Sequence, residues 1–163
     1  MKKISVLLGL IICLTGKAQF LPITGDSDLD KSLIELNNDV KNDIISFTND
    51  VAATFGLPKP KIETLLNIHH MQPADVVMAL EIAQITTQPI ENVASVFDKN
   101  KSKGWGVIAK EMGIKQGSKE FHQLKDNAKG KSKGMKGKGK NKEEGKGQGN
   151  GKGNGNNKGK GKK

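Results

Sequence analysis

The C-terminal end of the chain most constrains its fold, because residues 129–163 are almost entirely lysine, glycine and asparagine. This segment carries 13 lysines against two acids, Glu143 and Glu144, and Met135 is its single apolar side chain. Such a sequence buries too little apolar surface to offset the conformational entropy that ordering removes. We therefore predict a disordered, polycationic tail over residues 128–163, so that the fold has to be built from the residues before it.

The opposite end has the layout of an export signal. Lys2 and Lys3 precede an apolar run over residues 4–14, and Gly16 and Ala18 follow at the −3 and −1 positions of a small-residue cleavage site. The sequence predicts a signal peptide over residues 1–18, cleaved near Ala18, a linker over residues 19–26 and a periplasmic or secreted bacterial protein. The apolar run is shorter than the roughly 20 residues that a membrane span needs, so we predict no transmembrane segment in the mature chain.

The only cysteine, Cys13, lies within this apolar run. Cleavage would remove it, so we expect neither disulfide nor thiol chemistry in the mature protein. Two alternatives are a lipid anchor on Cys13 and an ordinary buried N-terminal helix. Ile12 argues against the anchor, which needs a small residue there. The lysines that precede the run argue against the buried helix.

Charge is divided unevenly along the chain. Residues 19–124 hold 10 lysines and 14 acids, whereas residues 125–163 hold 14 lysines and three acids. An acidic body with a basic end indicates an interaction arm rather than a domain with a basic groove. The basic residues are all lysine, which attracts phosphate or carboxylate without the bidentate geometry of arginine.

The middle of the chain predicts an all-α fold. From Ser27 onward the apolar residues recur at helical steps of three and four, which predicts a long N-terminal amphipathic helix that ends at Gly56. The stretch over residues 37–39 is a weak point where this helix could become two, with Asn38 or Asp39 capping the second. The apolar positions are Leu29, Leu33, Leu36, Val40, Ile44, Phe47, Val51 and Phe55.

Shorter helices are expected after Gly56. Pro73 and Pro89 each sit where a first helical turn would begin, and no window alternates with a period of two, so we expect no sheet. Faint matches at offsets of 28 and 30 residues suggest two helical hairpins packed on the first helix. We predict one helical domain over residues 27–127. The other expected helices span residues 61–69, 105–112 and 118–124.

The most distinctive motif outside the tail contains Gly104, Trp105, Gly106, Ile108, Ala109 and Gly113. A dinucleotide-binding loop would need flanking strands that the sequence lacks. The start of a DNA-reading helix-turn-helix unit is a second interpretation, although the next expected helix is short. We favour a structural motif in which the only tryptophan packs across a hairpin and the glycines let backbones approach closely.

Metal and catalytic sites find little support. His69 and His70 are adjacent and would point about 100° apart on a helix, and no carboxylate or cysteine stands at ligand spacing to them or to His122. The Asp-x-Asp-x-Asp run over residues 26–30 lacks the glycine and glutamate of a calcium loop. No serine or threonine has a recognisable base partner. We therefore predict no metal, no cofactor and no enzymatic activity.

Residues 104–125 read Gly-Trp-Gly-Val-Ile-Ala-Lys-x-Met-Gly-Ile-Lys-x-Gly-Ser-x-Glu-Phe-His-x-Leu-Lys. This motif resembles one found in small exported bacterial proteins of unknown function, which often end in lysine- and glycine-rich tails. The resemblance extends over residues 40–125. It implies export and an all-helical body, but it brings no activity, ligand or catalytic residue with it.

The expected function follows from the tail, which should bind polyanions such as envelope phosphates, acidic polysaccharide or extracellular DNA. It has no aromatic residue for base stacking, so we expect no sequence specificity. Three alternatives are a solubilising spacer, a helix-turn-helix nucleic-acid-binding protein that uses residues 79–97 or 105–124, and a periplasmic metal-binding protein. The predicted polyanion-binding residues are Lys129, Lys131, Lys133, Lys136, Lys138, Lys140, Lys142, Lys146, Lys152, Lys158, Lys160, Lys162 and Lys163.

Overall fold

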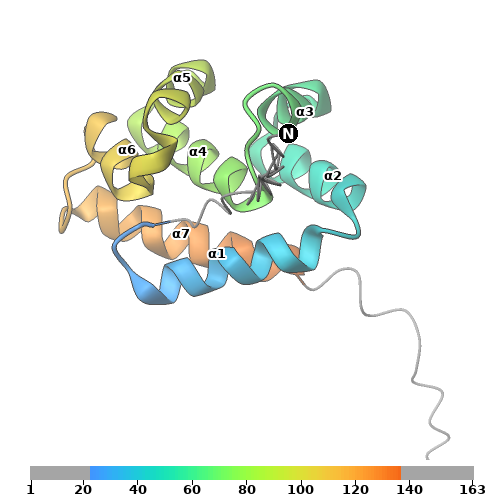
Figure 1. Ribbon diagram of the computed structural model, residues 1–163, viewed down its shortest axis with the longest axis horizontal. Helices are drawn as coiled ribbons and strands as arrows, with labels where there is room; N and C mark the ends of the chain where they lie inside the picture. The colour runs from blue at the N-terminus through green and yellow to red at the C-terminus, as the bar shows by residue number, and fades with distance from the viewer. Residues whose placement is uncertain (1–22, 137–163) are drawn as a thin grey trace, which may run out of the picture.

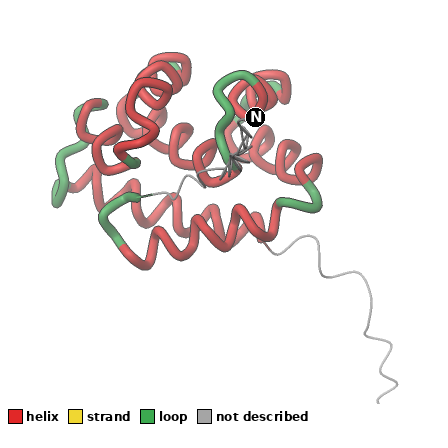
Figure 2. The backbone as a smooth tube through the Cα atoms, in the orientation of Figure 1, coloured by secondary structure: helices red, strands yellow, loops and turns green. Residues whose placement is uncertain are grey.

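The computed structural model describes residues 23–136, which form seven α-helices and one 3-10 turn. Figures 1 and 2 show these residues as helices and connecting loops with no strand. The prediction of an all-α domain is therefore confirmed. The predicted signal peptide, residues 19–22 of the predicted linker and the tail from residue 137 onward lie outside the described residues.

The predicted N-terminal helix is two helices, α1 (Ser27–Val40) and α2 (Ile44–Phe55). Asp26 caps α1, and Asp43 caps α2 by accepting a hydrogen bond from the Ser46 backbone N–H at 3.0 Å. The break therefore follows residue 40 instead of falling at residues 37–39. The predicted caps Asn38 and Asp39 lie within α1 and do not cap α2, while the Asn37 side-chain oxygen accepts at 2.8 Å from the Ala74 backbone N–H, in the first turn of the helix that begins at Pro73.

The central element is α4 (Pro73–Thr86), which contacts α1, α2, α5, α7 and α3 (Lys59–Asn67). Every residue from Pro73 to Ile82 is buried, so this helix has no solvent-exposed face along most of its length. Pro73 occupies the first turn, as predicted, and Gln72 and Asp75 form a capping box there. The hydrophobic core of the domain is built around this helix (Figure 1).

The second half of the fold contains α5 (Ile90–Asn100), the 3-10 turn η1 (Lys101–Lys103) and α6 (Trp105–Glu111). Pro89 stands at the N-cap of α5, one residue before the first turn where it was expected. The two expected hairpins differ in burial, because α4 is enclosed whereas α6 is short and packs mainly on α5 and η1. The faint sequence repeat therefore does not correspond to two equivalent structural units.

The last helix, α7 (Lys119–Lys136), is much longer than the expected helix over residues 118–124. The prediction that disorder begins at residue 128 is wrong for residues 128–136. Small buried residues continue the helical stripe past Leu124, and they let α7 pack closely on α1 and α4 despite Gly130 and Gly134 (Figure 1). The residues of this stripe are Phe121, Leu124, Ala128, Ser132 and Met135.

Candidate functional site

Four of the 13 predicted polyanion-binding lysines lie within the described residues, all on α7. Lys129 and Lys131 are partly buried, and Lys133 is exposed. Lys136 is described only through its backbone, as the last residue of the helix. The other nine, between Lys138 and Lys163, lie outside the described residues. Part of the candidate site therefore lies on α7, and the rest is known only as sequence.

Lys131 is bound by a carboxylate of the protein itself. Glu81, in the middle of α4, is fully buried and forms an ion pair with the Lys131 ammonium group. Its other oxygen accepts a hydrogen bond from the Asn127 side chain at 2.9 Å. The ammonium group also lies 4.4 Å from the centroid of the Phe55 ring. Because a buried carboxylate needs a partner, Lys131 serves as the internal counter-ion of Glu81.

Two further ion pairs fasten α7 to the beginning of α1, which runs beside it (Figure 1). Lys125 Nζ lies 2.5 Å from Asp26 Oδ2, and Lys129 Nζ lies 3.5 Å from Asp28 Oδ2. The hydrogen bond from Lys125, together with one from the Leu29 backbone N–H, lowers the pKa of Asp26. The pair of Lys129 is exposed and long, so it holds the lysine only weakly.

The Trp105 motif belongs to the core, as expected. Trp105 is fully buried, and its ring stacks on Phe97 with centroids 5.4 Å apart. Its indole N–H donates to Asp75 Oδ1 at 2.7 Å, while Asp75 Oδ2 accepts from the Gln72 backbone N–H at 2.9 Å. Ile108 is fully buried and Ala109 almost so. The motif therefore joins α6 to the start of α4 and to α5.

Asp75 was not recognised as a special residue from the sequence. Its burial raises its pKa to about 6, although the hydrogen bonds from Trp105 and Gln72 act in the opposite direction. A raised carboxyl pKa is common among catalytic acids. Asp75 is only 2% exposed, however, and each of its oxygens accepts a hydrogen bond from the protein. This arrangement fits a structural carboxyl group rather than one that reacts with substrate.

The glycines of the motif allow the N-terminal segment to lie against α6. Gly104 has a φ of +84° and a ψ of 168°, a conformation that only glycine adopts readily. A Cβ atom on Gly104 would lie 2.6 Å from the carbonyl oxygen of Ile23. That oxygen accepts a hydrogen bond from the Gly106 backbone N–H at 3.1 Å. The close approach that the sequence suggested is therefore made to Ile23 and Thr24.

Substituting Gly104→Ala should destabilise the fold by about 1–3 kcal/mol, since it adds both backbone strain and a clash with Ile23. Chemical denaturation would measure this loss. Gly113→Ala is the matched control, because Gly113 also has a positive φ of +91° but no atom within 4 Å of the added Cβ. Equal losses in the two variants would show that contact with Ile23 contributes nothing.

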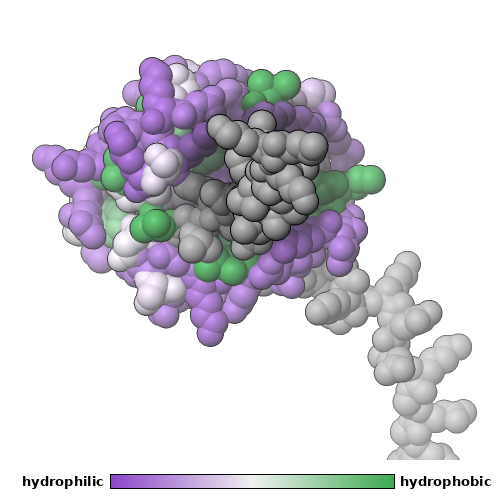
Figure 3. Space-filling view, in the orientation of Figure 1, coloured by the Kyte–Doolittle hydropathy of each residue, from purple (hydrophilic) through white to green (hydrophobic). Residues whose placement is uncertain are grey.

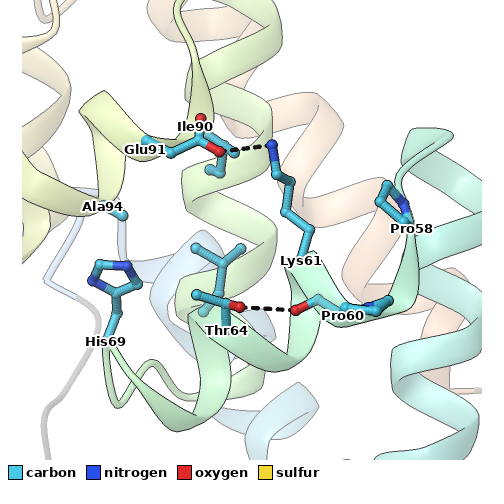
Figure 4. A pocket seen from close by; sticks show the side chains of 9 residues that line it. Pro58, Pro60, Lys61, Thr64, His69, Ile90, Glu91 and Ala94 are labelled. Atoms are coloured by element: carbon cyan, nitrogen blue, oxygen red, sulfur yellow. Dashed lines mark hydrogen bonds and ion pairs between the residues drawn. The ribbon is translucent and has the colours of Figure 1, made fainter.

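A cleft of about 360 Å³ opens between α3 and α5 (Figure 4). Lys61 reaches from α3 to Glu91 of α5, with Nζ 2.6 Å from Oε1. His69 also lines the cleft, and its Nδ1 lies 2.8 Å from Asp98 Oδ2. A neighbouring cleft of about 350 Å³ shares Lys61 and Glu91. The charged groups that line these clefts are thus paired with carboxylates of the protein, and the remaining walls are largely apolar.

The three histidines have different surroundings. His69 is paired with Asp98, His70 is exposed just after α3, and His122 is exposed on α7. Across residues 23–136, no three histidine, cysteine or acidic side chains gather closely enough to hold a metal ion.

Over the same residues, no helix has the length and apolar character needed to cross a lipid bilayer. The face of the molecule seen in Figure 3 is mainly hydrophilic, with apolar residues in small separate areas.

The described part of the chain is neutral as a whole but divided in charge. Residues 23–136 contain 15 lysines and 15 acids. Residues 26–50 hold seven acids and two lysines, whereas residues 99–119 hold six lysines and one acid. All six of these lysines are exposed, on the end of α5, η1, α6, the loop before α7 and the first residue of α7. The net charge of the body concealed this basic region, which the sequence analysis missed.

Comparisons with protein-family models, with curated proteins and with solved structures gave no match.

Proposed function

We propose that this protein is an exported, non-enzymatic helical protein that binds polyanions through the lysines at its C-terminal end. The main support is the step in charge along the chain. Residues 23–136 are neutral, whereas residues 137–163 carry nine lysines and two glutamates. We propose export from the sequence of residues 1–18. Mass spectrometry of the exported protein should give the mass of a chain that begins at Gln19, and any other mass would contradict cleavage after Ala18.

The structure refines which lysines would act. Lys131 neutralises buried Glu81, so it is withdrawn from the binding set proposed here. Lys129 remains in the set because its pair with Asp28 is exposed and easily exchanged. The proposed set is therefore Lys129, Lys133, Lys136 and the nine lysines between Lys138 and Lys163.

Lysine spacing explains how such a segment would bind a linear polyanion. One lysine occurs about every three residues after residue 136, or every ~10 Å when that segment is stretched along a polymer. This spacing is close to the Debye length of about 8 Å at physiological salt, so neighbouring charges act partly together. Binding would release counterions from the polymer, and its affinity should fall steeply as salt rises.

The chemistry of the segment also limits what it can recognise. It has neither the arginine that reads phosphate or base edges in a bidentate manner nor an aromatic residue for stacking. The proposed partners are envelope phosphates, acidic polysaccharide or extracellular DNA, bound without sequence preference. The helices of residues 79–97 contribute mainly to the core, which argues against the helix-turn-helix alternative there. Residues 105–124 overlap the basic region over residues 99–119, but they hold only the seven-residue α6 and the beginning of α7.

Replacing the nine lysines between Lys138 and Lys163 with glutamine should lower the salt concentration at which the full-length protein elutes from heparin resin. The matched control replaces the same residues with arginine, which preserves the charge and should preserve or raise retention. If the glutamine and wild-type proteins eluted together, the C-terminal lysines would not be the binding element. If the arginine variant lost retention, charge would not be the cause.

A further inference from the structure

We propose that the folded domain carries a second anion site, a pocket that holds one phosphate or sulfate group of the same polymer. This inference rests on the proposed function and adds a specific contact to it. The pocket has a volume of about 310 Å³ and lies between the segment over residues 23–25, α6 and the start of α7. Its lining includes Lys103, Lys110 and Gln116, together with Thr24 and Gly106.

The packing of the N-terminal segment on α6 creates this pocket. Gly106 donates its backbone N–H to the carbonyl oxygen of Ile23 at 3.1 Å. Thr24 is buried and is held by Asp30, which accepts from its backbone N–H at 2.9 Å and from its hydroxyl at 2.8 Å. A Cβ atom on Gly25 would lie 3.6 Å from the side-chain nitrogen of Gln116. The wall formed by Ile23 and Thr24 is thus fixed by main-chain and buried contacts, while Lys103, Lys110 and Gln116 line the pocket with exposed side chains.

The pocket presents hydrogen-bond donors that have no protein partner. Within residues 23–136, neither Lys103 nor Lys110 forms an ion pair, and the Gln116 side chain makes no hydrogen bond. Among the residues that the structure describes, the lining of the pocket contains no carboxylate. Asp26 and Asp30, which follow the lining segment in sequence, are engaged by Lys125 and by Thr24. A group with two or more charged oxygens would complement these donors.

The charged side chains of this pocket are unpaired within residues 23–136, unlike those of the two clefts beside α3. Lys61, which lines both of those clefts, is paired with Glu91 at 2.6 Å, and His69 is paired with Asp98 at 2.8 Å. A ligand would have to break the Lys61–Glu91 pair to use the charge of the lysine, and the hydrogen bond to Asp98 to reach His69 Nδ1. Lys103 and Lys110 need no such exchange, and they belong to the basic region over residues 99–119. Of these three clefts in the described residues, the 310 Å³ pocket is therefore the one best suited to an anion.

A pocket on the domain changes how the protein would hold its polymer. The C-terminal lysines follow α7, and the pocket lies at the other end of this helix, where the preceding loop contributes Gln116 and the first turn contributes Phe121. Once the C-terminal segment is bound at one end of α7, the pocket at the other end, about 27 Å away along the 18-residue helix, would meet other oxyanions of the same polymer at a raised effective concentration. Two attachment points would fix the orientation of the domain on the polymer, which a lysine-rich segment alone cannot do.

The test uses the full-length chain in which the nine lysines between Lys138 and Lys163 are glutamine, so that the tail contributes little binding. Tripolyphosphate and a sulfated heparin disaccharide are titrated separately and followed by ¹H–¹⁵N NMR. Amide shifts should concentrate at Gly106, Lys110 and Gln116. The substitutions Lys103→Gln and Lys110→Gln together should weaken binding about tenfold, a loss typical of removing charge-assisted contacts. The probe that binds more tightly identifies phosphate or sulfate as the natural group.

A control with Lys99→Gln and Lys119→Gln removes the same charge from exposed lysines that do not line the pocket. Affinity in this control should stay within about twofold of its parent. An equal loss in both double variants, or shifts spread over all exposed lysines, would overturn the pocket. The proposed function would survive that result, because the tail substitutions on heparin resin test it separately.

Discussion

Replacing Lys131 with methionine is expected to destabilise the protein by about 3–5 kcal/mol, because it leaves a fully buried carboxylate without its counter-ion. Methionine retains an apolar chain that can still pack on Phe55, so the lost ammonium group dominates the effect. Glu81 would keep only the hydrogen bond from Asn127 at 2.9 Å. Chemical denaturation followed by circular dichroism measures the loss.

Two variants make this result specific. Lys133→Met removes an exposed lysine two residues away on the same helix, and its effect should stay within about 0.5 kcal/mol. The double variant Glu81→Leu with Lys131→Met removes both charges and should recover most of the stability that Lys131→Met loses. If Lys131→Met behaved like Lys133→Met, the end of α7 would not be docked on Glu81.

The free energy of unfolding should fall as pH rises from about 4 to 7, because burial raises the Asp75 pKa to about 6 in the folded protein, against 3.8 as its ordinary value. Between these values the folded state keeps a proton that the unfolded chain releases, so lower pH favours folding. The stabilisation is complete below about pH 4 and lost above about pH 6. A shift of about two units corresponds to about 3 kcal/mol at most.

Asp75→Asn removes this titration and should flatten the stability profile between pH 4 and 7. It should also lower the stability of the acid form, since an amide cannot accept from both Trp105 and Gln72. Asp39→Asn, at an exposed position on α1, should leave the slope unchanged. An identical slope in the wild-type protein and Asp75→Asn would show that Asp75 titrates normally. Below pH 4 the acids with lowered pKa values, such as Asp26, act in the opposite direction, because the free energy of unfolding that they contribute is lost as pH falls.

Much of the fold could be predicted from local patterns. The apolar stripe of residues 29–55 and the position of Pro73 depend only on helical periodicity and on the missing N–H of proline. The end of α1 was misplaced because residues 37–39 resemble a helix break in sequence, whereas α1 continues to Val40 and Asn37 accepts a hydrogen bond from Ala74, 37 residues away. A pattern of neighbours along the chain cannot show such a contact.

The part of the candidate site that lies on α7 was not predicted, for a related reason. Composition showed residues 128–136 as too polar to fold, yet Ala128 and Ser132 are small enough to be buried between packed helices. Glu81 was visible as an acid within an apolar run, but its partner Lys131 is 50 residues away in the segment assigned to the tail. Net charge likewise averaged the acidic residues 26–50 with the basic residues 99–119.

If the lysines beyond α7 bind polyanions by charge alone, the affinity of the full-length protein should depend steeply on salt concentration. Binding of the full-length protein to a fluorescent duplex DNA of arbitrary sequence would be measured by anisotropy from 50 to 300 mM salt. We predict a slope of log K against log salt steeper than about −4, which reflects several neutralised phosphates. In the variant with glutamine at the nine lysines between Lys138 and Lys163, the slope should fall below about half of that value. A shallow slope in the wild-type protein, or the same slope in both proteins, would contradict polyanion binding by the charge of these lysines.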